Sequence, residues 1–197
     1  MRYFIAAWLF IFTISSINAA NKDYPELQQY VQKTVDEVSR ILNSAASDAE
    51  RIDKSKKLLA QNLQFGWMSK YTLGRHGKTL PANQLATFNE IYSAYMVKSF
   101  SDLVKNYKGE KINVKNVKNI DKDEYIVQTD VIKKNGQPSI KVDYLVHRMP
   151  DGNFKIGDII TEGVSMINSQ KDEFNSILKD HDFDSLITEL RKRTNNS

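Results

Sequence analysis

The stretch covering residues 154–178 changes its hydrophobic period midway, and this change most restricts how the chain can fold. Up to Thr161, side chains alternate in steps of two, which is typical of a strand. After Glu162 and Gly163, apolar residues recur at steps of three and four, as they do in a helix. Ser165 stands where a helix N-cap belongs, because its hydroxyl can accept from a first-turn N–H. A sheet layer is therefore predicted to meet a helical layer at this corner.

The remaining periodicity divides the chain into a helical first half and a second half of strands. Ser47 and Glu50 have the spacing of a capping box, which predicts a helix start. From Lys111 the period becomes two, with turn signals at Asn135-Gly136 and at residues 150–153. Helices are predicted over about 24–43, 47–64, 81–107 and 184–193, with a short apolar element at 65–73. The expected fold is α+β, with a helical N-terminal half packed on a curved four-stranded antiparallel sheet.

The N-terminal segment has the pattern of a secretory signal peptide. A positive start at Arg2 precedes about a dozen apolar residues, and small residues follow. The apolar run is shorter than the ~20 residues that a transmembrane helix needs. We predict a signal peptide over residues 1–19, with cleavage near Ala19 or Ala20, and a single domain over residues 20–197. An uncleaved N-terminal anchor is the alternative.

Composition excludes several classes of function. The chain has no cysteine, which removes disulfides, thiolate catalysis and thiolate metal sites. The formal charge is +4, and loss of Arg2 with the signal peptide would leave +3. A net charge this small does not favour nucleic acid as a partner.

Polar motifs give little support for catalysis or for a metal. The sequence Gly77-Lys78-Thr79 lacks the glycine spacing of a phosphate-binding loop. The three histidines lack ligand spacing, and His147 is predicted to face solvent because it alternates with the apolar Val146. Asp158 or Glu162 could serve as a general base, although both also suit structural roles near a helix N-terminus. We expect no metal and no cofactor.

Large side chains are concentrated in two neighbouring elements, the short apolar element and the long helix after it. Such residues suit either an ordinary core or an adaptable lining for an apolar ligand. The residues concerned are Trp67, Met68, Tyr71, Phe88, Tyr92, Tyr95, Met96 and Phe100.

Several segments resemble the MlaC (toluene-tolerance) family over about residues 24–190. The resemblance is carried by the run from Phe65 to Gly74, by residues 88–95, by residues 151–158 and most specifically by Glu162-Gly163-Val164-Ser165. It implies an NTF2-like cone with an apolar interior pocket. It also implies a soluble, non-enzymatic periplasmic phospholipid carrier. Such carriers shuttle lipid between an inner-membrane ABC transport complex and an outer-membrane lipoprotein–porin complex, which maintains outer-membrane lipid asymmetry.

The lining of this pocket is predicted to combine the aromatic stripe with apolar positions of the sheet and the corner. The full set is Trp67, Met68, Tyr71, Phe88, Tyr92, Tyr95, Met96, Phe100, Val127, Tyr144, Ile160, Val164 and Ile167.

Acyl chains require an interior cavity. Burial of a CH₂ is worth about 0.8 kcal/mol, so two chains of roughly 14 buried CH₂ groups each represent about 20 kcal/mol. The head group is expected to stay near the mouth in solvent, and the protein is expected to be a monomer. Two other hypotheses remain: a small NTF2-like isomerase or hydratase, and an interaction module that binds no ligand.

Overall fold

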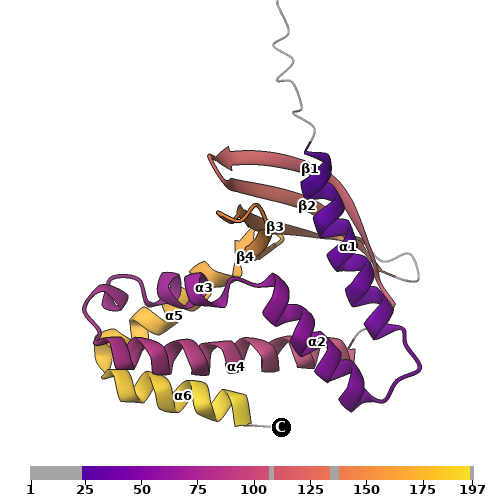
Figure 1. Cartoon of the computed structure of the whole chain (residues 1–197). Coiled ribbons are helices and arrows are strands. Elements are labelled where there is room, and N and C mark those ends of the chain that lie inside the picture. Colours follow the sequence, from indigo (N-terminus) through magenta and orange to yellow (C-terminus); the bar gives the residue numbers. More distant parts are fainter. Residues whose placement is uncertain (1–23, 107–108, 134–137, 196–197) are drawn as a thin grey trace, which may run out of the picture.

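A curved antiparallel sheet and two groups of helices form the computed structural model, which describes residues 24–106, 109–133 and 138–195 (Figure 1). Its helices are α1 (Pro25–Leu42), α2 (Asp48–Asn62), α3 (Phe65–Leu73), the 3₁₀ helix η1 (His76–Lys78), α4 (Ala82–Asn106), α5 (Met166–Asp180) and α6 (Phe183–Asn195). Its strands are β1 (Lys111–Asp121), β2 (Glu124–Ile132), β3 (Ile140–Arg148), β4 (Phe154–Thr161) and β5 (Val164–Ser165). The strands pair in chain order.

The predicted α+β architecture is confirmed, and the short strand β5 extends the four predicted strands. Helix α1 packs on β1 and β2, while α3, α4, α5 and α6 pack on one another as a separate helical group (Figure 1). Helix α2 contacts α1, α4 and β4, so it joins the two groups. The predicted signal peptide, Tyr107 and the turn Asn135-Gly136 lie outside the described residues.

The helix ends follow local sequence signals. The Ser47 hydroxyl accepts from the Glu50 backbone N–H at 3.3 Å, and the Glu50 carboxylate accepts from the Ser47 N–H at 3.0 Å. This is the predicted capping box, which satisfies two free donors at the start of α2. Gly74 ends α3 with a φ of +56°, a conformation that favours glycine.

The corner between β4 and α5 is a tight turn fixed by a buried carboxyl group. Glu162 and Gly163 have φ values of +49° and +82°, as in the two-residue hairpin turn that joins β4 to β5. Asp158 is 3% exposed and accepts from the Ser165 hydroxyl at 2.6 Å and from the Ile167 N–H at 3.1 Å. The Ser165 hydroxyl in turn accepts from an N–H of the first turn of α5, which confirms the predicted N-cap.

Part of the core lies within the helical group. Phe88 and Tyr92 of α4 each make an edge-to-face contact with Phe174 of α5. The Tyr92 hydroxyl donates to Gln170 at 2.7 Å, and burial raises the Tyr92 pKa far above its ordinary value. The Phe88, Tyr92 and Phe174 side chains are fully buried and form this part of the core.

Candidate functional site

A cavity of about 440 Å³ lies between the sheet, α1, α2 and α4. This volume is within the range of about 300–1,000 Å³ typical of small-molecule sites. Most of the lining is aliphatic, which favours an apolar ligand. The lining residues are Val31, Thr34, Val35, Val38, Ser39, Leu42, Ser55, Leu58, Leu59, Asn62, Leu63, Phe100, Glu110, Ile112, Val131, Lys133, Ile140, Tyr144, Ile156 and Ile159.

At one end of the cavity, the α2–α3 linker joins the sheet. Leu63 forms a parallel bridge with Ile156, and the Gln64 N–H donates to the Ile156 carbonyl at 2.9 Å. Ile156 pairs with Val146 of β3, and Ile140 lies six residues before Val146 on the same strand. At about 3.3 Å per residue, the lining therefore extends about 20 Å along β3, from the level of Ile156 to Ile140.

The middle of the cavity contains a tyrosine hydroxyl that stays neutral. Tyr144 lies on β3 opposite Val127 of β2 and Ile159 of β4. Burial raises the pKa of Tyr144 to about 12, although a hydrogen bond with Thr129 acts in the opposite direction. Among the described lining residues, the charged side chains are Glu110 and Lys133, both beyond the strand ends. The middle can therefore accept a hydrocarbon chain without desolvating a charge.

The structure places two of the predicted lining residues, Phe100 and Tyr144, at this cavity. It places the others outside the described lining. Met68, Phe88, Tyr92, Met96, Val127 and Ile167 are buried in the core, Trp67, Tyr71, Tyr95 and Ile160 are half-buried, and Val164 is 63% exposed. Contact between these residues and a lipid stays a prediction.

Half of the described lining residues come from α1 and α2, which sequence reasoning did not include. The signal was present, because Val31, Val35 and Val38 belong to the apolar stripe of α1. An aliphatic stripe has the same sequence pattern whether it faces a core or a cavity.

The two carboxyl groups considered for catalysis have structural partners. Asp158 bonds to the first turn of α5, and the Glu162 carboxylate accepts from the Lys141 N–H at 2.6 Å. Neither side chain lines the apolar cavity. The geometry thus offers no support for a general base acting on a ligand there.

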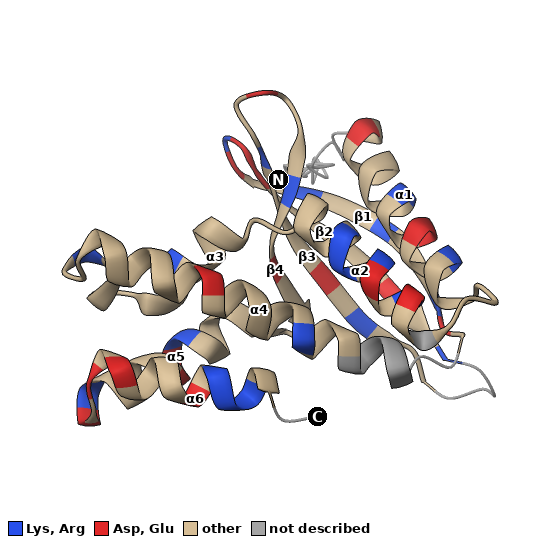
Figure 2. Ribbon diagram, turned by 60° about the horizontal axis from the view of Figure 1, so that its bottom comes forward, with Lys and Arg blue, Asp and Glu red and all other residues tan. Residues whose placement is uncertain are grey.

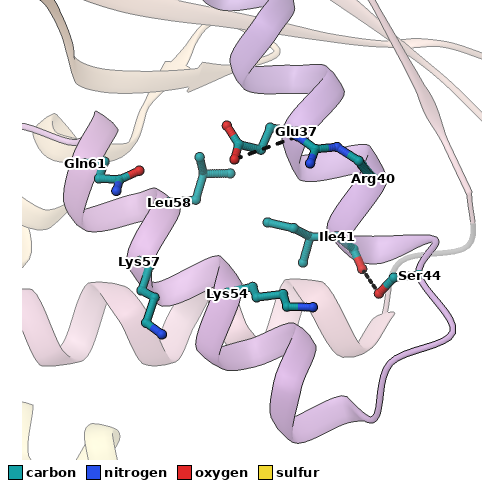
Figure 3. Close-up of a pocket in the computed structure, with 8 residues that line it drawn as sticks. All are labelled: Glu37, Arg40, Ile41, Ser44, Lys54, Lys57, Leu58 and Gln61. Atoms are coloured by element: carbon teal, nitrogen blue, oxygen red, sulfur yellow. Dashed lines mark hydrogen bonds and ion pairs between the residues drawn. The ribbon is translucent and has the colours of Figure 1, made fainter.

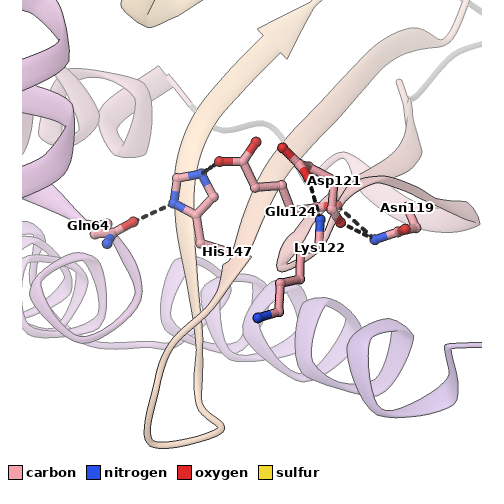
Figure 4. A network of polar contacts seen from close by, with 6 residues as sticks. All are labelled: Gln64, Asn119, Asp121, Lys122, Glu124 and His147. Carbon is pink, nitrogen blue, oxygen red and sulfur yellow. Dashed lines mark hydrogen bonds and ion pairs between the residues drawn. The ribbon is translucent and has the colours of Figure 1, made fainter.

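The prediction that His147 faces solvent is wrong. Its side chain is buried and its ring lies edge-on to Trp67 with centroids 4.5 Å apart. Nδ1 lies 2.5 Å from the Gln64 side-chain oxygen, and Nε2 lies 3.7 Å from the Glu124 carboxylate (Figure 4). Strand alternation failed here because Gln64 of the α2–α3 linker and Trp67 of α3 cover the His147 ring.

The outer side of the α1–α2 pair carries a charged groove of about 400 Å³ (Figure 3). Arg40, Lys54 and Lys57 surround a floor of Ile41 and Leu58. Leu58 lines both this groove and the apolar cavity, so the wall between them is one side chain thick at that point.

Neither a membrane span nor a metal cluster is found within residues 24–106, 109–133 and 138–195. No helix of this part is long and apolar enough to cross a membrane. The same residues contain no group of three or more His, Asp or Glu side chains that could hold a metal ion.

A family model and a curated relative carry the same family name, MlaC. A family model described as MlaC protein matches residues 32–192. The intermembrane phospholipid transport system binding protein MlaC of Haemophilus influenzae is 23% identical over 189 residues, covering 93% of this chain and 86% of that protein. A solved structure of a phospholipid-binding protein from Ralstonia solanacearum, in complex with a phospholipid, has a TM-score of 0.71 at 20% identity, covering 85% of this chain and 96% of the other. The chain belongs to the MlaC family.

Proposed function

We propose that this protein is a non-enzymatic phospholipid carrier that holds acyl chains in the cavity between α1, α2 and the sheet. The observation that carries the proposal is the aliphatic cavity of about 440 Å³, which extends into the fold without a charged group in its middle. The phospholipid named with the Ralstonia structure and the transport system named with the Haemophilus relative support the same ligand class.

Residues 1–19 direct export of the protein into the periplasm, and the carrier works there. It takes lipid from an inner-membrane ABC transport complex and exchanges it with an outer-membrane lipoprotein–porin complex, acting as a monomer that docks transiently on each. An apolar chain cannot cross water unprotected at an acceptable cost, since each exposed CH₂ costs about 0.8 kcal/mol. A cavity inside the carrier removes that cost during transfer.

We also propose that acyl chains contact Phe100 and Tyr144 from the predicted set, together with the aliphatic faces of α1 and α2. These two residues are the members of that set in the described lining. Contacts by the remaining predicted residues require the cavity to extend beyond its present walls.

The proposal is tested by measuring bound phospholipid in the wild type and in a variant with a larger side chain in the cavity lining. Protein purified from a bacterial host is extracted with organic solvent, and bound phospholipid is quantified by mass spectrometry. The wild type is expected to carry phospholipid, while Leu59→Trp, which adds bulk to the lining, is expected to carry several-fold less.

Ile120→Trp is the matched control, because Ile120 is 54% exposed at the β1–β2 turn and does not line the cavity. Circular dichroism shows whether both variants are folded. Wild-type protein that yields no phospholipid at full protein recovery would overturn the proposed function.

A further inference from the structure

The charged groove on the outer side of the α1–α2 pair is formed by one face of each helix. Residues three and four positions apart share a helix face, and the groove lining follows this spacing on both helices. The lining residues are Glu37, Arg40, Ile41 and Ser44 of α1, and Lys54, Lys57, Leu58 and Gln61 of α2. The groove is therefore the seam along which the two helices meet.

The rim of this groove is mainly basic, and its floor is apolar. Arg40, Lys54 and Lys57 belong to the lining, in which Glu37 is the acidic residue. Figure 3 shows Ile41 of α1 and Leu58 of α2 pointing into the groove from its two sides. These two side chains are only 9% and 6% exposed. A basic rim above an apolar floor suits a ligand in which an anionic group is joined to hydrocarbon.

The three basic side chains have carboxylate neighbours on their own helices. The Arg40–Glu37 distance is 3.8 Å, and the Lys57–Asp53 distance is 2.8 Å. Lys54 lies near enough to Glu50 to lower the pKa of that carboxyl group. Such exposed pairs contribute little, because water screens them. A phosphate that meets all three cations at once can therefore replace these neighbours.

The floor of the groove is also a wall of the apolar cavity, since Leu58 lines both. Hydrogen bonds join α1 and α2 on either side of this position. The Arg51 guanidinium donates to the Leu42 carbonyl at 3.1 Å, and the Thr34 hydroxyl donates to the Asn62 side-chain oxygen at 3.3 Å. Between these links, the groove and the cavity are separated by an apolar side chain whose rotation breaks no hydrogen bond.

We infer that this groove is the site at which a phospholipid enters the protein. Arg40, Lys54 and Lys57 hold the phosphodiester through charge-assisted hydrogen bonds, while the acyl chains pass Leu58 into the cavity. Free inorganic phosphate has the same anionic chemistry, but it makes no use of the apolar floor. An acidic protein segment would use the rim and would not need the connection to the cavity. The inference rests on the proposed carrier function and adds the route of lipid entry.

The test measures how fast delipidated full-length mature protein takes up lipid from phosphatidylcholine vesicles. The vesicles contain a trace of either tail-labelled phosphatidylcholine or diacylglycerol with the same labelled chains, and stopped-flow fluorescence follows the transfer. Both lipids leave the same vesicle surface, so attraction of the protein to that surface affects them equally. Only the phospholipid offers a phosphate to the groove.

Replacement of all three basic residues with Gln should slow phospholipid uptake by roughly five- to tenfold, as suits three partly screened charges. Diacylglycerol uptake should stay at the wild-type rate. The control is the triple variant Lys33→Gln, Lys56→Gln and Lys70→Gln, which loses the same charge at exposed positions outside the groove and the cavity. It should take up both lipids as the wild type does.

A second pair of variants tests passage of the chains at Leu58. Leu58→Ala opens the wall between groove and cavity, whereas Leu59→Ala enlarges the cavity without reaching the groove. Leu58→Ala should therefore take up both lipids faster than Leu59→Ala. Circular dichroism shows whether the variants are folded, and the exposed charge variants test the inference even if Leu58→Ala does not fold. Equal rates in the two folded Leu variants would overturn entry at this position.

The outcomes distinguish this inference from the proposed function. Uptake of no lipid by the wild type would overturn the carrier function itself. Equal phospholipid uptake by the wild type and both triple variants would overturn the entry site and leave the carrier function intact. Equal slowing of both lipids would show a general attraction to the vesicle, which also overturns it.

Two further probes separate the lipid from other anions. Inorganic phosphate alone should give no binding heat in isothermal titration calorimetry, and binding as tight as that of phospholipid would assign the groove to free phosphate. Polyglutamate binding that is lost in the groove variant, with lipid uptake unchanged, would assign the groove to an acidic protein segment. Either result overturns the inference.

Discussion

At the scale of single residues, Asp158 shows how a group that suggests catalysis can serve the fold instead. Its carboxyl oxygens accept from the Ser165 hydroxyl and from the Ile167 N–H, which is one of the free donors at the start of α5. The partial positive charge of a helix N-terminus favours a negative group at this position. Asp158 thus links the last long strand to the helix that follows it.

Replacement of Asp158 with Asn should lower the free energy of unfolding by about 1–3 kcal/mol, because a buried donor loses a charged acceptor. Ser165→Ala should cost about 1 kcal/mol as the loss of an N-cap. Urea denaturation measures the loss of stability in each variant. Because the Asp158 and Ser165 side chains bond to each other, the double variant should lose less stability than the two single losses added together. Asp172→Asn on the exposed face of α5 is the control. An Asp158→Asn protein as stable as that control would contradict this role.

At the scale of elements, the α2–α3 linker is attached to the sheet by several polar contacts around His147. The Gln64 N–H bonds to β4, its side-chain oxygen lies against His147 of β3, and the Lys155 ammonium donates to the Gln61 carbonyl. Gly157 leaves room for the ring, since a Cβ there would lie 2.6 Å from the His147 Cε1. These contacts fix the C-terminal end of α2, and with it one wall of the cavity.

This junction should make stability depend on pH. Burial lowers the His147 pKa below its ordinary value of 6.5, and the nearby Glu124 carboxylate offsets part of that effect. As the pH falls below about 6.5, the unfolded chain takes up a proton that the folded protein resists, so stability decreases. Above about pH 6.5, His147 is neutral in both states, and its contribution to the free energy of unfolding no longer changes with pH.

Urea denaturation at pH 8 and pH 5.5 measures this dependence. His147→Gln should lose less stability than the wild type between the two values, whereas the exposed His181→Gln should behave like the wild type. Equal losses in the wild type and in His147→Gln would contradict the assignment.

At the scale of the whole molecule, charge and apolar space are separated. Figure 2 shows that Lys, Arg, Asp and Glu positions are distributed along the helices and strands. The described lining of the apolar cavity between α1, α2 and the sheet has its charged residues, Glu110 and Lys133, beyond the strand ends. Helix α2 contacts both α1 and the helical group, so the cavity wall is continuous with the rest of the fold. Lipid binding should therefore stabilise the entire protein.

Phospholipid at 100 times its dissociation constant should add about 2.7 kcal/mol to the free energy of unfolding. For a protein of this size, that corresponds to a rise in melting temperature of about 5–10 °C. Differential scanning fluorimetry of delipidated and reloaded protein measures the shift, and Leu59→Trp should reduce it. Equal melting temperatures of delipidated and reloaded protein, with phospholipid still bound, would contradict this coupling.

The sequence by itself determined features that depend on local physical chemistry. The change of period at Glu162, the capping box at Ser47 and the N-cap at Ser165 each depend on residues within a few positions of one another, and all are confirmed. The family resemblance, carried by short motifs, is confirmed as well.

The tertiary structure alone decided where the apolar space lies. Phe88, Tyr92 and Met96 fill a close-packed core, while Val35 and Leu59 from shorter apolar stripes face the cavity. Core and cavity residues have the same composition and the same period, because both are simply removed from water. Only the distance to the opposing surface distinguishes them, and elements far apart in the sequence set that distance.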